Sequence, residues 1–235
     1  MILHWKIYAL SGQAPPKNTN PENAFGWLDD PDVAAVFEKV CAELLPESDR
    51  GAVLIAADIA TQQLDKAFVS RGPKYMKSRI RRMQSYPGIA STLSAKAEIA
   101  GLCGWIDEKC LNAIDSLRKI RNEAAHSDGQ FSLETQTEQL NNMLALGKGV
   151  SNAVHNMAVE LLVLNFFHTL RKDGEKLVNV LGENPFGSFE KIVEELEKRP
   201  EWSTTLEARI PRIKLGLGLC LIVWLIAQKQ EAPDV

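Results

Sequence analysis

The chain has 235 residues, of which 45% are hydrophobic, and this content is sufficient for a substantial folded core. Twenty-seven Lys and Arg residues stand against thirty Asp and Glu residues, which gives a net charge near −3. This balance excludes a protein that is drawn to nucleic acid or acidic lipid by its overall charge, so any such binding must come from a local patch.

An irregular segment precedes the first predicted helix. Residues 11–24 are rich in Pro, Asn and Gly, so we expect residues 1–29 to form an N-terminal arm and linker. Asp30 can cap the helix that follows, with Pro31 at its first position, and Pro46 stops it. The folded core is therefore predicted to begin at Asp30.

The second predicted helix is the central one. Ser48 or Asp49 can cap it, and its dense Ala, Leu and Ile content predicts burial on most sides until it ends before Gly72. A basic run follows, which consists of Lys74, Lys77, Arg79, Arg81 and Arg82. We interpret this run, together with Arg118, as a candidate nucleic-acid surface, and a solvated helical face is the ordinary alternative.

The segment from Asp107 to Asp128 is the centre of the functional prediction. A short helix over residues 94–103 precedes it, and Gly104 separates the two. Apolar residues recur at spacings of three along the segment, which predicts a helix with one buried face; they are Leu111, Ile114, Leu117 and Ile120. Residues 127–129 are expected to end this helix.

Helices are predicted to continue through the second half of the chain. They comprise a polar helix over 132–146, a strongly apolar helix over 150–170, a charged helix after Ser188 that Pro200 ends, and a final helix over 206–230. The segment 150–170 is too hydrophobic for a surface helix. No stretch alternates as a strand does, so we predict an all-α bundle: a helical core over 30–129 and a C-terminal helical extension over 130–235 packed on it.

Two features bear on the cellular compartment. The run Leu215 to Ala227 has 13 uncharged residues, and runs of about 10 to 14 are more often core helices than membrane spans. The four cysteines form no C-x-x-C pair and lie in apolar surroundings, which indicates buried thiols in a reduced chain; they are Cys41, Cys103, Cys110 and Cys220. The N-terminus lacks the features of a signal peptide, so we expect a cytoplasmic protein, and a membrane-associated effector that uses Leu215 to Ala227 is the less favoured alternative.

A polar cluster is expected near the end of the helix over 107–128. Arg118, Asn122 and His126 are four residues apart and share one stripe, and Arg121 lies beside it. Because Arg121 and His126 are separated by about 140° around an α-helix, they converge only if the helix end distorts or a second chain completes the site. The structural alternative is that the arginines compensate the helix dipole and that His126 caps the last carbonyls.

Two stretches, RGAVLIAADIATQQLDKAF at 50–68 and YPGIASTLSAKAEIAGLCGWI leading into LRKIRNEAAHS at 86–127, resemble the mannitol operon repressor family. This all-helical family has a signature that ends in a similar arginine–asparagine–histidine run, and the resemblance covers roughly residues 48–128. RNEAAH is also similar to the R-x4-6-H motif of the HEPN superfamily, in which paired helical bundles often form metal-independent ribonucleases. The basic run is a departure from the repressor family.

The HEPN resemblance implies catalytic roles for Arg121, Asn122 and His126 in a homodimer that acts on RNA, for example as a toxin or defence effector. His126 would serve as general base or acid, since imidazole titrates near neutral pH. Arg121 would stabilise charge on the phosphoryl group, and Asn122 would orient one of its oxygens. The repressor resemblance implies instead a non-enzymatic transcriptional regulator that acts through protein partners.

The sequence gives no sign of a metal or cofactor. His155 and His168 lie in apolar helical sequence, where core or interface histidines are more usual than ligands, and no H-x-x-x-H or H-E-x-x-H spacing is present. There is also no glycine-rich phosphate loop and no G-x-S-x-G motif. We therefore expect no cofactor and no metal.

Overall fold

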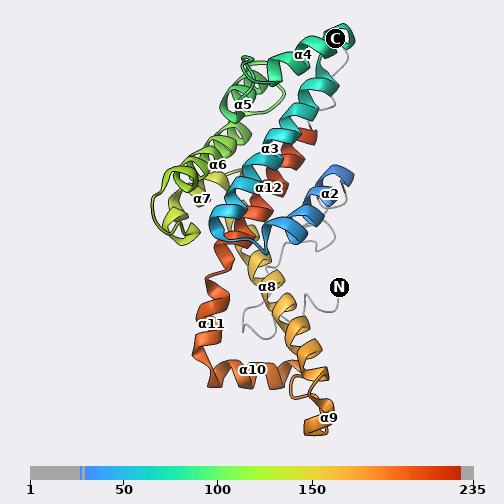
Figure 1. Cartoon of the computed structure of the whole chain (residues 1–235), viewed down its shortest axis with the longest axis vertical. Helices are drawn as coiled ribbons and strands as arrows, with labels where there is room; N and C mark the ends of the chain where they lie inside the picture. Colours follow the sequence, from blue (N-terminus) through green and yellow to red (C-terminus); the bar gives the residue numbers. More distant parts are fainter. Residues whose placement is uncertain (1–26, 28–29, 229–235) are drawn as a thin grey trace.

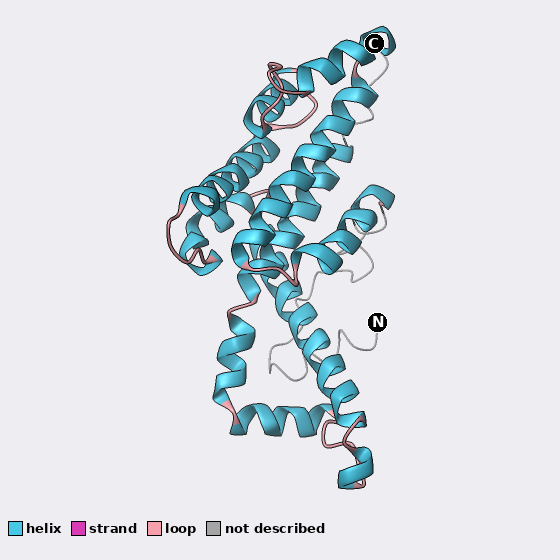
Figure 2. Cartoon of the chain, in the orientation of Figure 1, coloured by secondary structure: helices cyan, strands magenta, loops and turns pink. Residues whose placement is uncertain are grey.

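The computed structural model of the chain describes Trp27 and residues 30–228, and all regular secondary structure in these residues is helical (Figure 2). The predicted all-α class is confirmed. Of the predicted N-terminal arm, every residue except Trp27 lies outside the described part.

The helices form a bundle from which one long arm extends (Figure 1). They are α2 (Pro31–Lys39), α3 (Asp49–Arg71), α4 (Lys77–Gln84), α5 (Leu93–Leu102), α6 (Glu108–His126), α7 (Thr137–Met143), α8 (Val150–Glu175), α9 (Val178–Leu181), α10 (Phe189–Lys198), α11 (Pro200–Glu207) and α12 (Ile210–Gln228). A π-helical turn, Val40–Leu44, continues α2, and short 3-10 turns precede α4 and α7. In the bundle, α3 packs against α5, α6 and α12.

Side-chain caps begin several helices where the sequence predicts them. Asp30 Oδ1 accepts a hydrogen bond from the N–H of Asp32 at 2.9 Å, and Ser48 Oγ accepts one from the N–H of Gly51 at 3.2 Å. Asp107 caps α6 in the same way. These bonds satisfy backbone donors that the first turn of a helix leaves without a partner, so the predicted starts of α2, α3 and α6 are confirmed.

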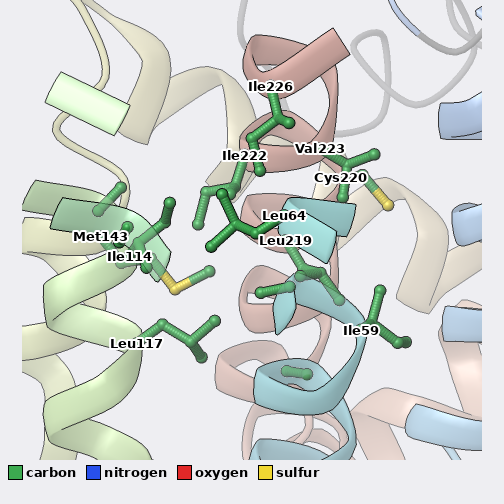
Figure 3. Packing of buried hydrophobic residues seen from close by; sticks show 14 of the residues in the cluster. Ile59, Leu64, Ile114, Leu117, Met143, Leu219, Cys220, Ile222, Val223 and Ile226 are labelled. Carbon is green, nitrogen blue, oxygen red and sulfur yellow. The ribbon is translucent and has the colours of Figure 1, made fainter. Parts of the chain in front are cut away.

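The core is built around α12, which contacts α2, α3, α6, α7 and α8. Figure 3 shows Leu219, Ile222 and Ile226 of α12 among buried side chains of α3, α6 and α7. Gly216 lets α12 pack closely against the π-helical turn that follows α2, because a Cβ at this position would lie only 2.5 Å from Cγ1 of Val40. A helix from the predicted C-terminal extension therefore fills the centre of the bundle formed by the preceding helices.

The apolar run in α12 is part of one helical stretch, Glu201–Gln228, that is long and apolar enough to cross a membrane. Of its most apolar window, 56% is buried inside the protein. Trp224 is half-buried and packs against the main core cluster. A core helix and a membrane span share this composition, and here the helix packs as a core helix.

The arm consists of the second half of α8 with α9, α10 and α11 (Figure 1). The prediction that α8 is too apolar for the surface is wrong for this half, where Phe167 and Leu170 are only half-buried. His155 and His168 are exposed, so they are not core residues, and their placement at an interface stays a prediction. Pro200 follows the end of α10, as predicted, but it also begins α11, a short helix that the sequence did not predict, and the final helix begins at Ile210 rather than at residue 206.

None of the four cysteines forms a disulfide, and two of them are buried and two exposed. Cys110 and Cys220 are buried as expected, and burial raises the pKa of Cys220 to about 12. Cys41 and Cys103 are exposed, so the expectation of buried thiols is wrong for these two. Cys41 lies in the π-helical turn after α2 and Cys103 at the end of α5, and an apolar sequence neighbourhood does not require burial of every residue.

Candidate functional site

Helix α6 remains regular to its last residue, His126. The N–H of Ser127 donates to the carbonyl oxygen of Glu123 at 2.9 Å, which is an ordinary helical hydrogen bond. The end of the helix therefore does not distort, and Arg121 and His126 stay about 140° apart around its axis. Because a distorted helix end is excluded, Arg121 and His126 could meet only if a second copy of the chain supplied one of them.

Arg50, at the start of α3, holds the segment that follows His126. Its Nη2 lies 2.9 Å from the carbonyl oxygen of Ser127, 3.0 Å from Ser127 Oγ and 2.8 Å from the carbonyl oxygen of Gly129. Hydrogen bonds from a charged donor are stronger than neutral ones, so this contact fixes the end of α6 against α3. The side chain of His126 is exposed and makes no hydrogen bond or ion pair within the described residues. Arg50, rather than His126, therefore binds carbonyl oxygens at the end of α6.

Asp49, the neighbour of Arg50, contacts two further parts of the bundle. Its Oδ1 accepts hydrogen bonds from Arg212 Nε at 3.0 Å and Nη2 at 2.7 Å, and its Oδ2 accepts one from the N–H of Leu133 at 2.9 Å. The pair is mostly buried, with side-chain exposures of 15% for Asp49 and 22% for Arg212. The start of α3 is thereby joined to α12 and to the chain that follows α6.

Arg121 and Asn122 face a hollow of about 650 Å³ between α3, α5 and α6. The hollow is polar, and its lining includes the hydroxyl residues Thr61, Ser91, Thr92 and Ser94. Arg121 Nη1 lies 3.3 Å from Asn122 Oδ1, which is the only hydrogen bond of this guanidinium among the described residues. His126 does not line the hollow, so one chain brings together two of the three predicted catalytic residues.

Arg118 also lines this hollow, but Asp115 holds its guanidinium. Its Nε and Nη2 lie 2.8 and 2.7 Å from Asp115 Oδ1, and Lys119 Nζ lies 3.1 Å from Oδ2 of the same carboxylate. Burial acts to raise the pKa of Asp115, but hydrogen bonds and charge from Arg118 and Lys119 outweigh it and lower the pKa below its usual value. Arg118 is therefore less available to a ligand than Arg121.

The basic run lies on and just before α4, and all five of its side chains are exposed. Lys74, Lys77 and Arg81 line a second hollow, of about 740 Å³, between α4 and the end of α3. Lys66 of α3 lines it as well. Lys66 thus joins the predicted nucleic-acid surface, although it lies outside the basic run in the sequence.

A buried ion pair joins α3 to α5 between the two hollows. Lys96 Nζ lies 2.9 Å from Asp65 Oδ1, and the Lys96 side chain is only 4% exposed. A lysine is almost never buried without a partner, and here the carboxylate of Asp65 compensates its charge. Sequence reasoning missed this pair and the Arg50 contact, because both join residues that are more than thirty positions apart.

The described residues contain no cluster of three or more His, Cys, Asp or Glu side chains that could hold a metal ion. The chain matches no family model, and no curated protein or solved structure matches it either. The resemblances to the mannitol operon repressor family and to the HEPN superfamily therefore stay predictions, and the chemistry must be argued from the residues themselves.

Proposed function

We propose that the chain is a HEPN-like RNA-acting protein that works as a homodimer and cleaves RNA without a metal. In this proposal, Arg121 of one copy and His126 of the other face the same scissile phosphate. Asn122 is placed beside Arg121 by their hydrogen bond, at 3.3 Å. The cytoplasm supplies the reduced environment that suits four free thiols.

One observation carries the proposal. Arg121 and His126 are both exposed, neither has a described acidic partner, and they lie on different sides of a regular helix. An arginine that stabilises the fold is usually paired, as Arg118 and Arg212 are here. A two-fold dimer in which α6 packs near its own copy would bring each Arg121 toward the partner's His126.

The chemistry needs only these groups and RNA itself. The ribose 2′-oxygen attacks the adjacent phosphorus, a P–O2′ bond forms and the P–O5′ bond breaks. One imidazole accepts the 2′-hydroxyl proton, and an imidazolium or water returns a proton to the departing 5′-oxygen. The guanidinium of Arg121 stabilises the negative charge that develops on the phosphoryl oxygens.

The direct test is cleavage of labelled RNA in the presence of a chelator. Arg121→Ala removes one charge-stabilising group and is expected to slow cleavage about 10²- to 10³-fold. His126→Ala removes the acid or base and is expected to cost about 10²- to 10⁴-fold. Arg171→Ala is the matched control, since Arg171 is exposed on α8, and it should leave the rate unchanged. Equal rates in all three variants would refute the catalytic roles.

Mixing the two inactive variants tests whether the site spans two copies. In a mixed dimer, one site lacks both residues and the other has both. Because half of the dimers in an equal mixture are mixed, the mixture should regain about a quarter of the wild-type activity. A site formed within one chain would regain nothing, so this outcome would contradict the two-copy arrangement.

A second candidate function is a non-enzymatic regulator that acts through a protein partner. The observation that favours it is an exposed apolar group on and next to α9, at the tip of the arm: Leu177, Val178, Val180 and Leu181, with Val180 81% exposed. Exposed apolar patches often mark protein contacts. This candidate predicts that wild type leaves RNA intact and that Val180→Asp alters transcript levels in cells, whereas Asn179→Asp, its matched control, does not.

A further inference from the structure

The surface around α4 is unusually free of negative charge. Residues 67–97 contain no Asp or Glu, although the whole chain has thirty. All five side chains of the basic run are exposed, and none makes a hydrogen bond or an ion pair within the described residues. No acidic side chain of the described residues forms an ion pair with these five cations, and the net charge of the protein does not reveal this local positive charge.

The hollow beside α4 concentrates this charge. Four cationic residues line it, namely Lys66, Lys74, Lys77 and Arg81, and Ser70 and Ser85 also contribute to its lining. Of the four, only Lys66 has an acidic partner among the described residues, Asp32, whose Oδ1 lies 3.9 Å from Lys66 Nζ on the exposed surface. Asp65 lines it too, but its carboxylate is held 2.9 Å from the buried ammonium of Lys96. Cations and hydroxyl groups around a recess suit the phosphate oxygens of an entering chain.

Two exposed aromatic rings flank the hollow. Tyr75 is 86% exposed and follows Lys74 directly, and Tyr86 is 91% exposed and follows Ser85 directly. An aromatic ring usually buries much of its surface, so two tyrosines that leave theirs in solvent, each next in sequence to a residue of this hollow, suggest a binding surface. Every base has a flat face that can stack on such a ring, and stacking next to a cationic groove is how many proteins hold unpaired strands.

The hollow beside α4 also lies in line with the hollow at Arg121. Leu54, Asp58 and Thr61 of α3 line the Arg121 hollow, and Asp65, Val69 and Gly72 line the one beside α4. These positions recur every three or four residues and form one stripe along α3. Thr61 and Asp65 are about 6 Å apart along the helix axis, so a strand held at α4 would lead toward Arg121.

We propose that the surface formed by Lys66, Lys74, Lys77 and Arg81, with Tyr75 and Tyr86, binds a single-stranded nucleic acid. The cations contact its phosphates and the two rings stack on its bases. Its role in delivering RNA to Arg121 rests on the proposed function, whereas strand binding itself does not. A duplex keeps its bases stacked internally, so it offers the two rings no face on which to stack.

The experiment measures binding of a fluorescent 12-residue oligodeoxythymidylate to the full chain by anisotropy. This probe has no 2′-hydroxyl, so cleavage cannot complicate the result. If the four cations contact phosphates, the logarithm of the binding constant should fall with the logarithm of salt concentration with a slope of about −3. Lys77→Gln and Arg81→Gln should each weaken the slope by about 0.7, and Lys148→Gln, an exposed control far from α4 in the sequence, should leave it unchanged.

Ring substitutions separate stacking from simple apolar contact. Tyr75→Leu and Tyr86→Leu should each weaken binding about fivefold or more, whereas Tyr75→Phe and Tyr86→Phe should retain it. All four changes are at exposed positions, so circular dichroism should show an unchanged fold. Leucine variants that bind as tightly as wild type would overturn the stacking contact and the proposal with it.

Two further probes complete the test. A 12-base-pair duplex should bind more weakly than the single strand, and vesicles of phosphatidylcholine with phosphatidylserine should not bind. Binding to vesicles alone, or no binding of the strand at low salt, would overturn the proposal. Strand binding that depends on the tyrosines, in a protein that fails to cleave RNA, would refute the proposed ribonuclease and leave this surface intact.

Discussion

Helices α8 and α12 each contain an apolar run, LLVLNFF in α8 and LGLGLCLIVWLIA in α12, but the two runs occupy different surroundings. α12 is enclosed by five other helices, and ten of its residues are buried. α8 packs mainly against α12, and its second half extends into the arm with half-buried side chains such as Phe167 and Leu170. An apolar run therefore indicates that a helix packs against other helices, and the number of helices around it decides how much of its surface is buried.

The largest expected difference concerns the thiol of Cys220, which is in α12. Alkylation requires the helix to open and the thiol to ionise, and burial raises its pKa to about 12. Because opening a core helix costs much of the global stability, Cys220 should react at least about 10³-fold more slowly than exposed Cys103. Mass spectrometry of a time course measures both rates, and Leu170→Cys on α8 should fall between them. Comparable rates at Cys220 and Cys103 would contradict the burial of α12.

Matched leucine substitutions compare the packing of the two helices directly. Leu219→Ala in α12 leaves a cavity in the core and should lower the free energy of unfolding by about 2–5 kcal/mol. Leu170→Ala in α8 removes a half-buried side chain and should cost less than about 1 kcal/mol. Denaturant titration provides both values. Similar losses would mean that the arm is packed as tightly as the core.

The next effect concerns the attachment of α12 to α3. Arg212→Ala leaves the mostly buried carboxylate of Asp49 without its charged partner, which should cost about 1.5–3 kcal/mol. Arg209→Ala, three residues earlier and exposed, is the control and should change stability by less than about 0.5 kcal/mol. Arg212→Lys should recover only part of the loss, because an ammonium lacks the two parallel donors.

The smallest expected effect comes from Asp115 in α6. Asp115→Asn loses its ion pairs with Arg118 and Lys119 on a partly exposed helix surface, which should cost about 0.3–0.5 kcal/mol near neutral pH. Because folding lowers the pKa of Asp115, its contribution is present above the pKa of the unfolded chain and is lost as pH falls through the folded pKa. The difference between the two proteins should therefore vanish in acid, and a pH series of denaturant titrations measures it. Asp173→Asn, at an exposed pair in α8, is the control.

The local part of the candidate site could be predicted from the sequence. The start and end of α6, the exposed placement of Arg121 and the basic run next to α4 follow from caps, glycines and side-chain spacing. The contacts of Arg50 with Ser127 and Gly129 could not be predicted, because they depend on how α3 lies against α6. The same holds for Lys96, whose burial is explained only by Asp65 on another helix.

The sequence by itself determined the helical class, the starts of the main helices and the residues that carry the candidate chemistry, because these depend on neighbours within a few positions. Tertiary structure decided which apolar helix became the core, which histidines and cysteines reached the surface, and that Arg121 and His126 of one chain stay apart. These outcomes depend on packing between distant segments, which a local pattern does not encode. The regular end of α6 excludes a distorted helix end, so Arg121 and His126 could meet only across two copies of the chain, as proposed above.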